Sequence, residues 1–512
     1  MNKIMFISAL LLSSSVAFAD WAKESDFPFV ILNSEDLITI DKDGLSESTF
    51  TSEYQAVNEE GRNFLVLQSY PISPDSSSVT FIKGFSKTND AITMVNPKDI
   101  KTRNSSVKSG LTNRQEMIIP FSNIQIGSTV SYTVREKEKK NLVKGLFHRK
   151  YIQGLRAPEK SGKAKIKSLL PLYVHINDPW QSIQSKQYKD GKYFVFEFVQ
   201  TKPLFKMPTE FNPILKKDSV TSIDISTMNN WSTFSATLAE KYESSLKTKI
   251  FPPAYNSIIE KANKAPSIHE KIDIVTSELA KIMTYSGDWT SFEKAFIPRT
   301  LAQVALLKTG DCKDFSVATT AMLRKMGIKA NIAMVKRSDS SQSNMTFQRF
   351  SDIVDPGYFN HAIVKVKDGE KTIWVDPTNI VSNSSNVFTD IAGSSAVEIS
   401  KDSPGLETIP VPPLGATHLA FDKTIKINAD GSADTVTNFD ATGDFVKLLL
   451  ETSFAKNEET AKKYLTTLLR SDSKNSKAVF EGVDFKTRLS KKFKGVQNSF
   501  GEIIIHDKGG QK

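Results

Sequence analysis

The sequence of 512 residues predicts an α+β protein of about three domains. Short alternating or apolar runs, separated by turn residues, fill the first part of the chain. A helical hydrophobic period takes over in the middle, and strand signals return after about residue 400. We therefore expect an N-terminal antiparallel β domain over residues 20–225, a central α+β core over 226–398 and a small C-terminal β domain over 399–512.

Residues 1–19 have the pattern of a secretory signal peptide. Lys3 precedes an apolar run, and Ala17-Phe18-Ala19 forms an A-x-A cleavage site before Asp20. A buried N-terminal helix is the alternative, which the three consecutive serines and the A-x-A end disfavour. We expect a secreted protein of the bacterial periplasm. No later stretch approaches about 20 uninterrupted apolar residues, so no transmembrane segment is predicted.

The composition is that of an ordinary globular protein, with 39% hydrophobic and 24% charged residues. The formal charge is +10, but Lys and Arg are interspersed with Asp and Glu. Even the densest basic run, residues 135–150, carries two glutamates. A nucleic-acid groove would need a patch of one sign with interleaved aromatic residues, so no nucleic-acid partner is predicted. A weak attraction to anionic envelope surfaces is compatible with this charge.

The N-terminal region shows few stretches with a helical period. Its strands are expected at runs such as "FVIL", "FLVLQSY", "SVTFIKGF", "STVSYTV" and "YFVFEFV". Asp43-Gly44 and Asp190-Gly191 are hairpin signals. Together these patterns predict an antiparallel sandwich or a barrel-like domain.

The central region contains three successive helix patterns, at residues 232–249, 267–285 and 300–308. In the second, apolar residues recur at helical spacing, namely Ile268, Ile272, Val275, Leu279 and Ile282. The third is expected to end at Thr309-Gly310, with Gly310 in the C-terminal capping position. A fourth helix begins at Cys312 and stops at Gly327.

Strands are predicted after this helix at "ANIAMVKR", "FNHAIVKV" and "KTIWVDPT". Between the first two lies a polar stretch, residues 338–358, which we interpret as a long loop that borders and gates a cleft. In the C-terminal region, Asp430-Gly431 predicts another hairpin, and a helix is expected over residues 457–470.

Cys312 is the only cysteine of the chain, so no intrachain disulfide can form. A lone thiol in an oxidising compartment is a liability, which makes its presence noteworthy. An inert, buried cysteine is the alternative interpretation. Asp311 is a suitable N-cap, and Asp314 suits the first helical turn. Helix N-termini favour thiolates, but these two carboxylates oppose that effect, so a cationic base is needed nearby.

Local geometry selects His361 from the six histidines. If Asp368-Gly369 forms a two-residue hairpin loop, His361 faces Asp376 on the neighbouring strand. Directly opposed side chains have Cβ atoms about 4.5–5.5 Å apart, close enough for the carboxylate to orient the imidazole. The alternating apolar residues of the same hairpin, Ala362, Val364, Ile373 and Val375, form the opposite face. A surface cross-strand pair is the alternative, and the interpretation depends on the register.

These blocks resemble the transglutaminase-like superfamily, which includes transglutaminases and bacterial cysteine proteases. The matching pattern is Gly-x-Cys at a helix start, Asn-His on a strand and a Trp shortly before Asp-Pro. The resemblance covers about residues 230–395 and implies a papain-like core. It also implies Cys312 as nucleophile, His361 as base and Asp376 as the residue that orients the base.

The flanking regions show weaker resemblances. The run "IQIGSTVSYTV" resembles a domain of unknown function that precedes this core in bacterial envelope proteins, and the C-terminal segment resembles a small domain that can follow it. Besides the Cys312 backbone N–H, an oxyanion donor or cleft residue is expected among Tyr285, Trp289 and Trp374, for which core packing or loop anchoring is the alternative. No EF-hand or clustered acidic loop is present, so neither a metal nor a cofactor is predicted.

The sequence thus predicts an envelope enzyme that cleaves or transfers amide acyl groups through a Cys312 thioester. Its partner is expected to be a protein or peptide substrate. Hydrolysis by a peptidase or amidase is favoured over crosslinking, because water is abundant and no acceptor-site feature is visible. A non-catalytic binding or scaffold protein is the alternative, since a fold alone does not ensure activity. The sequence gives no indication of the oligomeric state.

Overall fold

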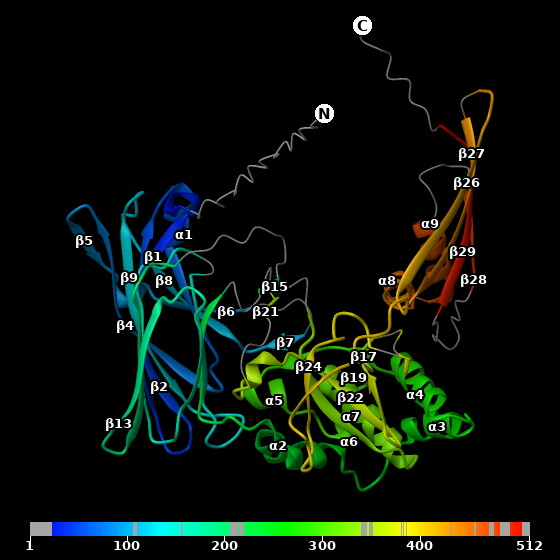
Figure 1. The fold of residues 1–512 in the computed structure, drawn as a ribbon, viewed down its shortest axis with the longest axis horizontal. Coiled ribbons are helices and arrows are strands. Elements are labelled where there is room, and N and C mark those ends of the chain that lie inside the picture. Colours follow the sequence, from blue (N-terminus) through cyan, green and yellow to red (C-terminus); the bar gives the residue numbers. More distant parts are fainter. Residues whose placement is uncertain are drawn as a thin grey trace, which may run out of the picture.

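A computed structural model of the chain shows three successive parts, a β-rich N-terminal domain, an α/β core and a C-terminal β domain with two helices (Figure 1). The structure describes residues 23–105, 110–154, 157–204, 214–215, 220–338, 346–347, 352–379, 381, 383–385, 387–430, 432–454, 457–469, 476–481 and 492–503. The predicted signal peptide lies outside them. None of the described helices is long and apolar enough to cross a membrane.

An eight-stranded sheet forms the body of the N-terminal domain. Its order is β13 (Ile183–Asp190), β14 (Tyr193–Gln200), β11 (Gly162–Ser168), β1 (Phe29–Ile40), β2 (Ser46–Ala56), β9 (Thr129–Glu138), β4 (Ser77–Thr88) and β5 (Ala91–Met94). Neighbouring strands are antiparallel except β1 and β11, which run parallel. The predicted turns at Asp43 and Asp190 join β1 to β2 and β13 to β14.

Two three-stranded sheets cover one face of this large sheet. One consists of β10 (His148–Gln153), β16 (Thr221–Ser226) and β12 (Tyr173–Asn177), and the other of β3 (Leu67–Ile72), β8 (Gln115–Pro120) and β6 (Lys101–Asn104). Ile38 and Ile166 pack against Ile223, and Val134 packs in the same way among the residues of β8. Short helix α1 (Glu59–Leu65) adds Leu65 to this core. The domain is therefore a β-sandwich, in which alternate side chains face the interior.

The core contains an antiparallel five-stranded sheet in the order β23 (Lys371–Val375), β22 (His361–Asp368), β20 (Ala330–Val335), β24 (Ser395–Glu398) and β25 (Leu406–Thr408). Its helices are α2 (Trp231–Leu246), α3 (Pro253–Asn263), α4 (Ile268–Ile282), α5 (Phe292–Phe296), α6 (Leu301–Leu307) and α7 (Cys312–Lys325). The central helix α7 is buried along most of its length and packs on β20 and β22.

The helices differ from the sequence prediction in two respects. The predicted helices correspond to α2, α4, α6 and α7, whereas α3 and α5 were not predicted. The capping role assigned to Gly310 was wrong, because Lys308 ends α6 in the left-handed conformation, with φ 53°. Gly310 lies instead in β19 (Thr309–Gly310), where an added Cβ would come within 2.5 Å of the Asp314 Cβ. The glycine therefore makes room for the first turn of α7.

Among the described residues, short parallel pairs lie within the core and between the core and the N-terminal domain. In the core, β17 (Thr284–Tyr285) pairs with β19. Strand β18 (Asp288–Trp289) pairs with β7 (Leu111–Thr112) of the N-terminal domain. β15 (Ile214–Leu215) pairs with β21 (Thr346–Phe347), which belongs to the predicted long loop. Most of that loop, residues 339–345 and 348–351, lies outside the described residues, so its gating role stays a prediction.

The C-terminal domain is a four-stranded antiparallel sheet with two helices. The strand order is β26 (His418–Ile427), β27 (Ser432–Thr442), β29 (Lys492–Ile503) and β28 (Ser476–Glu481). The predicted helix corresponds to α9 (Glu458–Leu469), and α8 (Asp444–Phe454) precedes it. Figure 1 shows this domain projecting from the core, with α8 nearest to the core.

Single 3-10 turns lie at Glu24–Asp26, Pro97–Asp99 and Pro356–Tyr358.

Candidate active site

Cys312 is the first residue of α7 and is 9% exposed. Asp311 caps the helix as predicted, since its carboxylate accepts a hydrogen bond from the Lys313 backbone N–H at 3.1 Å. The Asp314 carboxylate in turn accepts the Asp311 N–H at 3.1 Å, which completes a capping box. The thiol is thereby fixed at a helix N-terminus, where free backbone N–H groups favour negative charge.

Each carboxylate beside the thiol is matched by a cation that the sequence did not reveal. Lys313 forms an ion pair with Asp311, and both side chains are buried. Arg299 donates two bonds to Asp314 Oδ2, from Nε at 3.0 Å and from Nη2 at 2.7 Å. The expectation that the two carboxylates act against a thiolate therefore needs correction, because a cation in direct contact offsets each of them.

The hairpin that carries His361 has a different register from the predicted one. Val364 pairs with Val375, and Asp368 pairs with Lys371, so the loop is Gly369-Glu370 rather than Asp368-Gly369. His361 does not directly oppose Asp376, and that part of the prediction was wrong by two residues. A shift of two keeps every side chain on its predicted face, because side chains alternate with a period of two. Asp376 therefore still lies on the His361 side, diagonally across the strands.

The structure brings the two side chains together despite this shift. His361 Nε2 lies 3.1 Å from Asp376 Oδ2, and the two side chains are 4% and 3% exposed. The approach is close enough for an ion pair, but Nε2 lies off the direction of a hydrogen bond, so we treat the contact as an ion pair. Because Nε2 faces the carboxylate, Nδ1 is the ring nitrogen left for the thiol.

Asp376 is held by a dense set of donors from the segment that follows it. Thr378 donates to Oδ1 from its backbone N–H at 3.1 Å and from its hydroxyl at 2.6 Å, and the Asn379 amide donates to Oδ2 at 3.0 Å. Burial alone raises the pKa of Asp376, but His361, Arg337 and Thr378 outweigh it and hold the pKa well below its usual range. The carboxylate is thus ionised and fixed in orientation.

His361 is correspondingly basic. Burial lowers the pKa of its imidazole, but the Asp376 carboxylate and then the neighbouring Cys312 act more strongly and raise the pKa to about 9. Helix α7 is fixed against this strand, since the Ser316 hydroxyl donates to the Ala362 carbonyl at 3.2 Å. At neutral pH the site therefore favours a protonated imidazole between the thiol and a carboxylate.

Tyr285 lies beside the thiol. It pairs with Gly310 across β17 and β19, and its ring centroid is 6.3 Å from that of Phe315. Burial, followed by the neighbouring Cys312 and Asp311, raises the pKa of Tyr285 well above its usual range, although 42% of the residue is exposed. The hydroxyl is therefore protonated at neutral pH and is available as a hydrogen-bond donor on an accessible side of the site.

The other two candidates for the cleft occupy different positions. The Trp289 ring lies against Gly110 and Gly287, where an added Cβ would come within 2.8 Å and 2.2 Å of ring atoms, so it anchors the domain contact. Trp374 is 7% exposed in a cluster with Ile363 and Ile391. The Lys365 ammonium lies 5.6 Å from its ring centroid. Trp374 is therefore a core residue, and its assignment to the cleft needs correction.

One group of the described residues has metal-ligating side chains within reach of one another, namely His148, Asp224 and Asp355. The two His148 nitrogens lie 3.6 Å from Asp224 and 3.2 Å from Asp355. The Lys150 ammonium also lies 3.3 Å from Asp224, so a protein cation already balances this carboxylate. The arrangement fits an ion-pair contact between the N-terminal domain and the core better than a metal centre.

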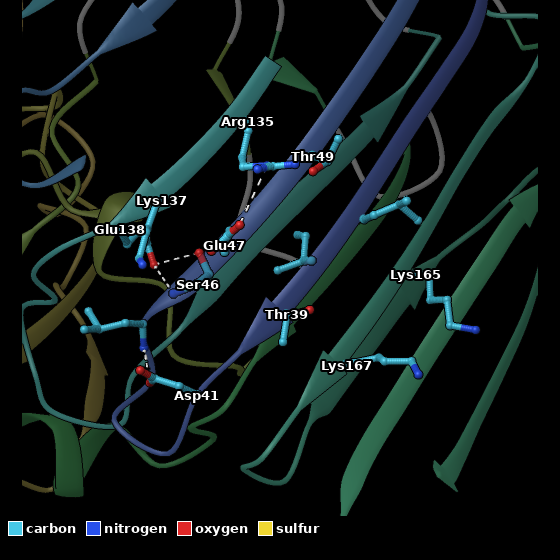
Figure 2. Close-up of a pocket in the computed structure, with 13 residues that line it drawn as sticks. Thr39, Asp41, Ser46, Glu47, Thr49, Arg135, Lys137, Glu138, Lys165 and Lys167 are labelled. Atoms are coloured by element: carbon cyan, nitrogen blue, oxygen red, sulfur yellow. Dashed lines mark hydrogen bonds and ion pairs between the residues drawn. The ribbon is translucent and has the colours of Figure 1, made fainter. Parts of the chain in front are cut away.

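A groove of about 680 Å³ lies on the outer face of the large N-terminal sheet (Figure 2). Side chains from four adjacent strands cross it, and most of its charges are paired, as in Arg135 with Glu47 at 3.7 Å and Lys167 with Asp190 at 2.9 Å. Its lining residues include no cysteine or histidine. This groove is therefore separate in composition and position from the thiol site.

Several residues of the site were not found by sequence reasoning. Thr378 had a readable signal, because an Asp followed two residues later by a Thr is a common turn with side-chain bonds to the backbone. Arg299, Lys313 and Arg337 had no such signal. Arg299 and Arg337 reach their partners across 15 and 39 positions of the chain, and Lys313 is one of 67 basic residues.

A buried Cys–His–Asp group, with the cysteine at the start of a central helix and the histidine on an antiparallel sheet, is the arrangement of a papain-like thiol enzyme. Comparison with known families narrows the class. Residues 255–377 match the transglutaminase-like superfamily, and residues 42–212 match a domain of unknown function with solved structures, DUF3857. The two matches lie in the predicted order, with the β-rich domain before a region similar to the transglutaminase-like superfamily.

One solved structure shares the fold over nearly the whole chain. A crystal structure of a proposed protease from Parabacteroides distasonis matches with a TM-score of 0.58 at 12% identity, over 93% of both chains. A structure described as a TGase covers 43% of this chain and 52% of its own, at 13% identity and a TM-score of 0.20. An M1 zinc metallopeptidase from Deinococcus radiodurans covers 40% and 44%, at 9% identity and a TM-score of 0.22. No curated protein matches the chain.

Proposed function

We propose that this protein is a secreted cysteine peptidase or amidase of the cell envelope, in which Cys312, His361 and Asp376 act as a catalytic triad. The observation that carries the proposal is the buried ion pair between His361 and Asp376, with Cys312, the only cysteine of the chain, as an electrostatic neighbour of the same imidazole. Desolvating such a pair is costly, and a purely structural role does not require a thiol beside it.

In the first half of the reaction, the proton of the Cys312 thiol resides on His361, and the thiolate attacks the carbonyl carbon of a substrate amide. The new S–C bond places negative charge on the carbonyl oxygen. The Cys312 backbone N–H, unpaired at the helix start, and the Tyr285 hydroxyl are the donors proposed to stabilise it. The C–N bond then breaks, the departing amine takes the proton from His361, and a thioester remains on Cys312.

In the second half, His361 removes a proton from the incoming nucleophile, which attacks the thioester carbonyl. The S–C bond breaks, and His361 returns its proton to the sulfur, so the thiol is regenerated. Water as nucleophile gives hydrolysis, and an amine gives crosslinking. We favour hydrolysis of a protein or peptide substrate, because water is abundant and an acceptor amine would need a binding feature that the chain does not display.

Alkylation of the thiol tests this proposal without knowledge of the substrate. Iodoacetamide should label Cys312 at pH 6 much faster than it labels free cysteine, because the imidazolium of His361 holds the thiolate. Labelling no faster than that of free cysteine would instead favour the non-catalytic scaffold. Cys312→Ala should abolish turnover of an amide or thioester probe while the melting temperature stays nearly unchanged.

The proposed location rests on the N-terminal sequence alone. If residues 1–19 are a signal peptide, the protein purified from the periplasmic fraction of an expressing bacterium begins at Asp20. Mass spectrometry of the intact chain measures this directly, and a chain that keeps Met1 in the cytoplasmic fraction would contradict the assignment.

A further inference from the structure

A guanidinium contacts the same oxygen of Asp376 that His361 contacts. Arg337 Nη1 is 3.6 Å from Asp376 Oδ2, and its Nη2 donates to Asn379 Oδ1 at 3.0 Å. The same Asn379 donates its amide N–H to Asp376 Oδ2 at 3.0 Å. Arg337 therefore contacts the carboxylate directly and also fixes the amide that holds it, which gives the planar guanidinium two ways to orient Asp376.

The backbone places Arg337 next to the imidazole strand. Val335, the last residue of β20, pairs with His361, and Arg337 follows two positions later. Asn360, the residue before His361, clamps the Arg337 backbone. Its Oδ1 accepts the Arg337 N–H at 2.7 Å, and its Nδ2 donates to the Arg337 carbonyl at 2.9 Å. The Asn of the Asn-His pair thus locks the arginine to the histidine strand.

The opposite side of the guanidinium is held by Asp390, which also contacts the C-terminal domain. Arg337 Nε lies 2.7 Å from Asp390 Oδ2. Lys447 of α8 reaches the same oxygen at 3.3 Å, and its ammonium lies 4.7 Å from the Phe388 ring centroid. The first residue of α8, Asp444, accepts the Thr389 backbone N–H at 3.1 Å. The start of α8 therefore grips the segment 388–390 at three successive residues.

We propose that Arg337 is a positioning residue for Asp376, and that the C-terminal domain sets its place through Asp390 and Lys447. The contacts form one continuous chain of charges, from His361 through Asp376, Arg337 and Asp390 to Lys447 on α8. His361 and Asp376, at the start of this chain of charges, are nearly fully buried, whereas the Lys447 side chain at its other end is 17% exposed. The inference rests on the proposed function, since it assigns a role toward the imidazole that activates Cys312.

The pH dependence of Cys312 alkylation reports this role. The titratable or charged groups that face His361 and Asp376 among the described residues are Cys312 from α7, Arg337 beyond β20 and Tyr285 from β17. If Arg337 only contributed charge, its removal would raise the pKa of the imidazolium and of the thiol and would move the acid limb of the rate to higher pH. If it positions Asp376, its removal takes the carboxylate away from His361, which moves that limb to lower pH and lowers the rate on the plateau, because the thiolate loses its imidazolium partner.

The experiment measures the iodoacetamide rate from pH 4 to 9 in the full-length protein. Arg337→Gln should lower the midpoint of the acid limb by about one pH unit and lower the plateau above it, so that alkylation at pH 6 slows about tenfold. Arg337→Lys should restore only part of the rate, because a point charge cannot contact Asp376, Asn379 and Asp390 together. Melting temperatures of both variants separate this effect from a loss of folding.

Lys447→Ala tests the link to the C-terminal domain. It should slow alkylation at pH 6 about threefold in the wild-type background and have no effect in the Arg337→Gln background, because coupled contacts are not additive. Lys494→Ala is the matched control, since Lys494 forms an exposed ion pair with Asp440 in the same domain. Equal rates for the Lys447 and Lys494 variants would overturn the link.

The two levels of the proposal fail in different ways. If wild-type Cys312 reacts at pH 6 no faster than free cysteine, the proposed function is wrong and the role of Arg337 falls with it. If the wild type reacts fast and Arg337→Gln keeps the same midpoint, or moves it to higher pH, the function stands and the positioning role is overturned.

Discussion

Two histidine–aspartate pairs occupy equivalent places in different sheets of this molecule. In the core, Asp376 lies diagonally across the hairpin from His361. In the C-terminal domain, His418 pairs with Thr442, and Asp440 lies two residues away in the same diagonal relation. The contact distances are similar, at 3.1 Å in the core and 2.9 Å in the C-terminal domain.

The difference between the pairs lies in burial and in a third partner. The core pair is 4% and 3% exposed and meets the Cys312 thiol, whereas the other pair is 44% and 33% exposed. Solvent screens an exposed pair, so its charges influence each other little. Within the core, the carboxylate and thiol overcome the burial of the imidazole and raise the pKa of His361 to about 9. Cross-strand geometry alone therefore does not make a catalytic base.

The largest effect is expected from breaking the buried pair. Asp376→Asn should lower turnover of an amide or thioester probe about 10³-fold, because the amide can neither fix the imidazole tautomer nor stabilise the imidazolium. Asp440→Asn removes the same carboxylate from the exposed pair and should leave turnover unchanged. Similar rates for the two variants would mean that burial does not distinguish the pairs.

The next effect concerns stability and pH. Since the pKa of His361 is raised from 6.5 to about 9 by folding, its stabilising contribution is complete below about pH 6.5 and disappears as pH rises through about 9. The stability difference between wild type and His361→Gln should therefore shrink by about 3 kcal/mol over this range. Urea unfolding at several pH values measures it, and a difference that grows with pH would contradict the assignment.

A third comparison concerns two ion pairs, each between an arginine and a carboxylate, that differ in how much of their side chains solvent reaches. Arg299 contacts Asp314 through Nε and Nη2, with side chains 18% and 4% exposed, and Arg103 contacts Glu116 through the same atoms, at 68% and 30%. Arg299→Ala should destabilise the protein by about 3 kcal/mol, because it leaves a buried carboxylate unpaired at the start of α7. Arg103→Ala is the control and should leave the urea midpoint unchanged.

The smallest effect is expected from the exposed histidine. His418→Ala should change neither the iodoacetamide rate of Cys312 nor the melting temperature by more than about 2 °C, because surface ion pairs contribute little. Differential scanning calorimetry and the alkylation assay check both values. A marked loss of stability would show that the exposed pair holds β26 to β27 more firmly than its solvation suggests.

The predictable parts of the site are those that local rules decide. The Asp311 cap, the start of α7 at Cys312 and the two faces of the hairpin follow from side-chain chemistry and from the alternation of strands. The register was less certain, because Gly369 can occupy either position of a two-residue loop, and its φ of 58° fits both. An error of two residues left the faces intact, and an error of one would have separated His361 from Asp376.

The remaining parts depend on tertiary contacts. Helix α3 had a readable start, since Pro253 suits the first helical position and Tyr255, Ile258, Ile259 and Ala262 form its buried stripe. The five residues of α5 are too few for a periodic signal. The counter-charges of Asp311, Asp314 and Asp376 follow only from the packed fold, because any of many Lys and Arg residues meets the chemical requirement.

The pairing of β7 with β18 makes the two larger domains structurally dependent on each other. The N-terminal domain supplies the neighbouring strand three residues after Tyr285, and Gly110 leaves room for the Trp289 ring at the same contact. A core excised from this chain would lose that support beside its thiol. Replacing either domain by that of a relative is therefore expected to succeed only when the contact residues of both domains still match. The two domains should therefore be inherited as one unit.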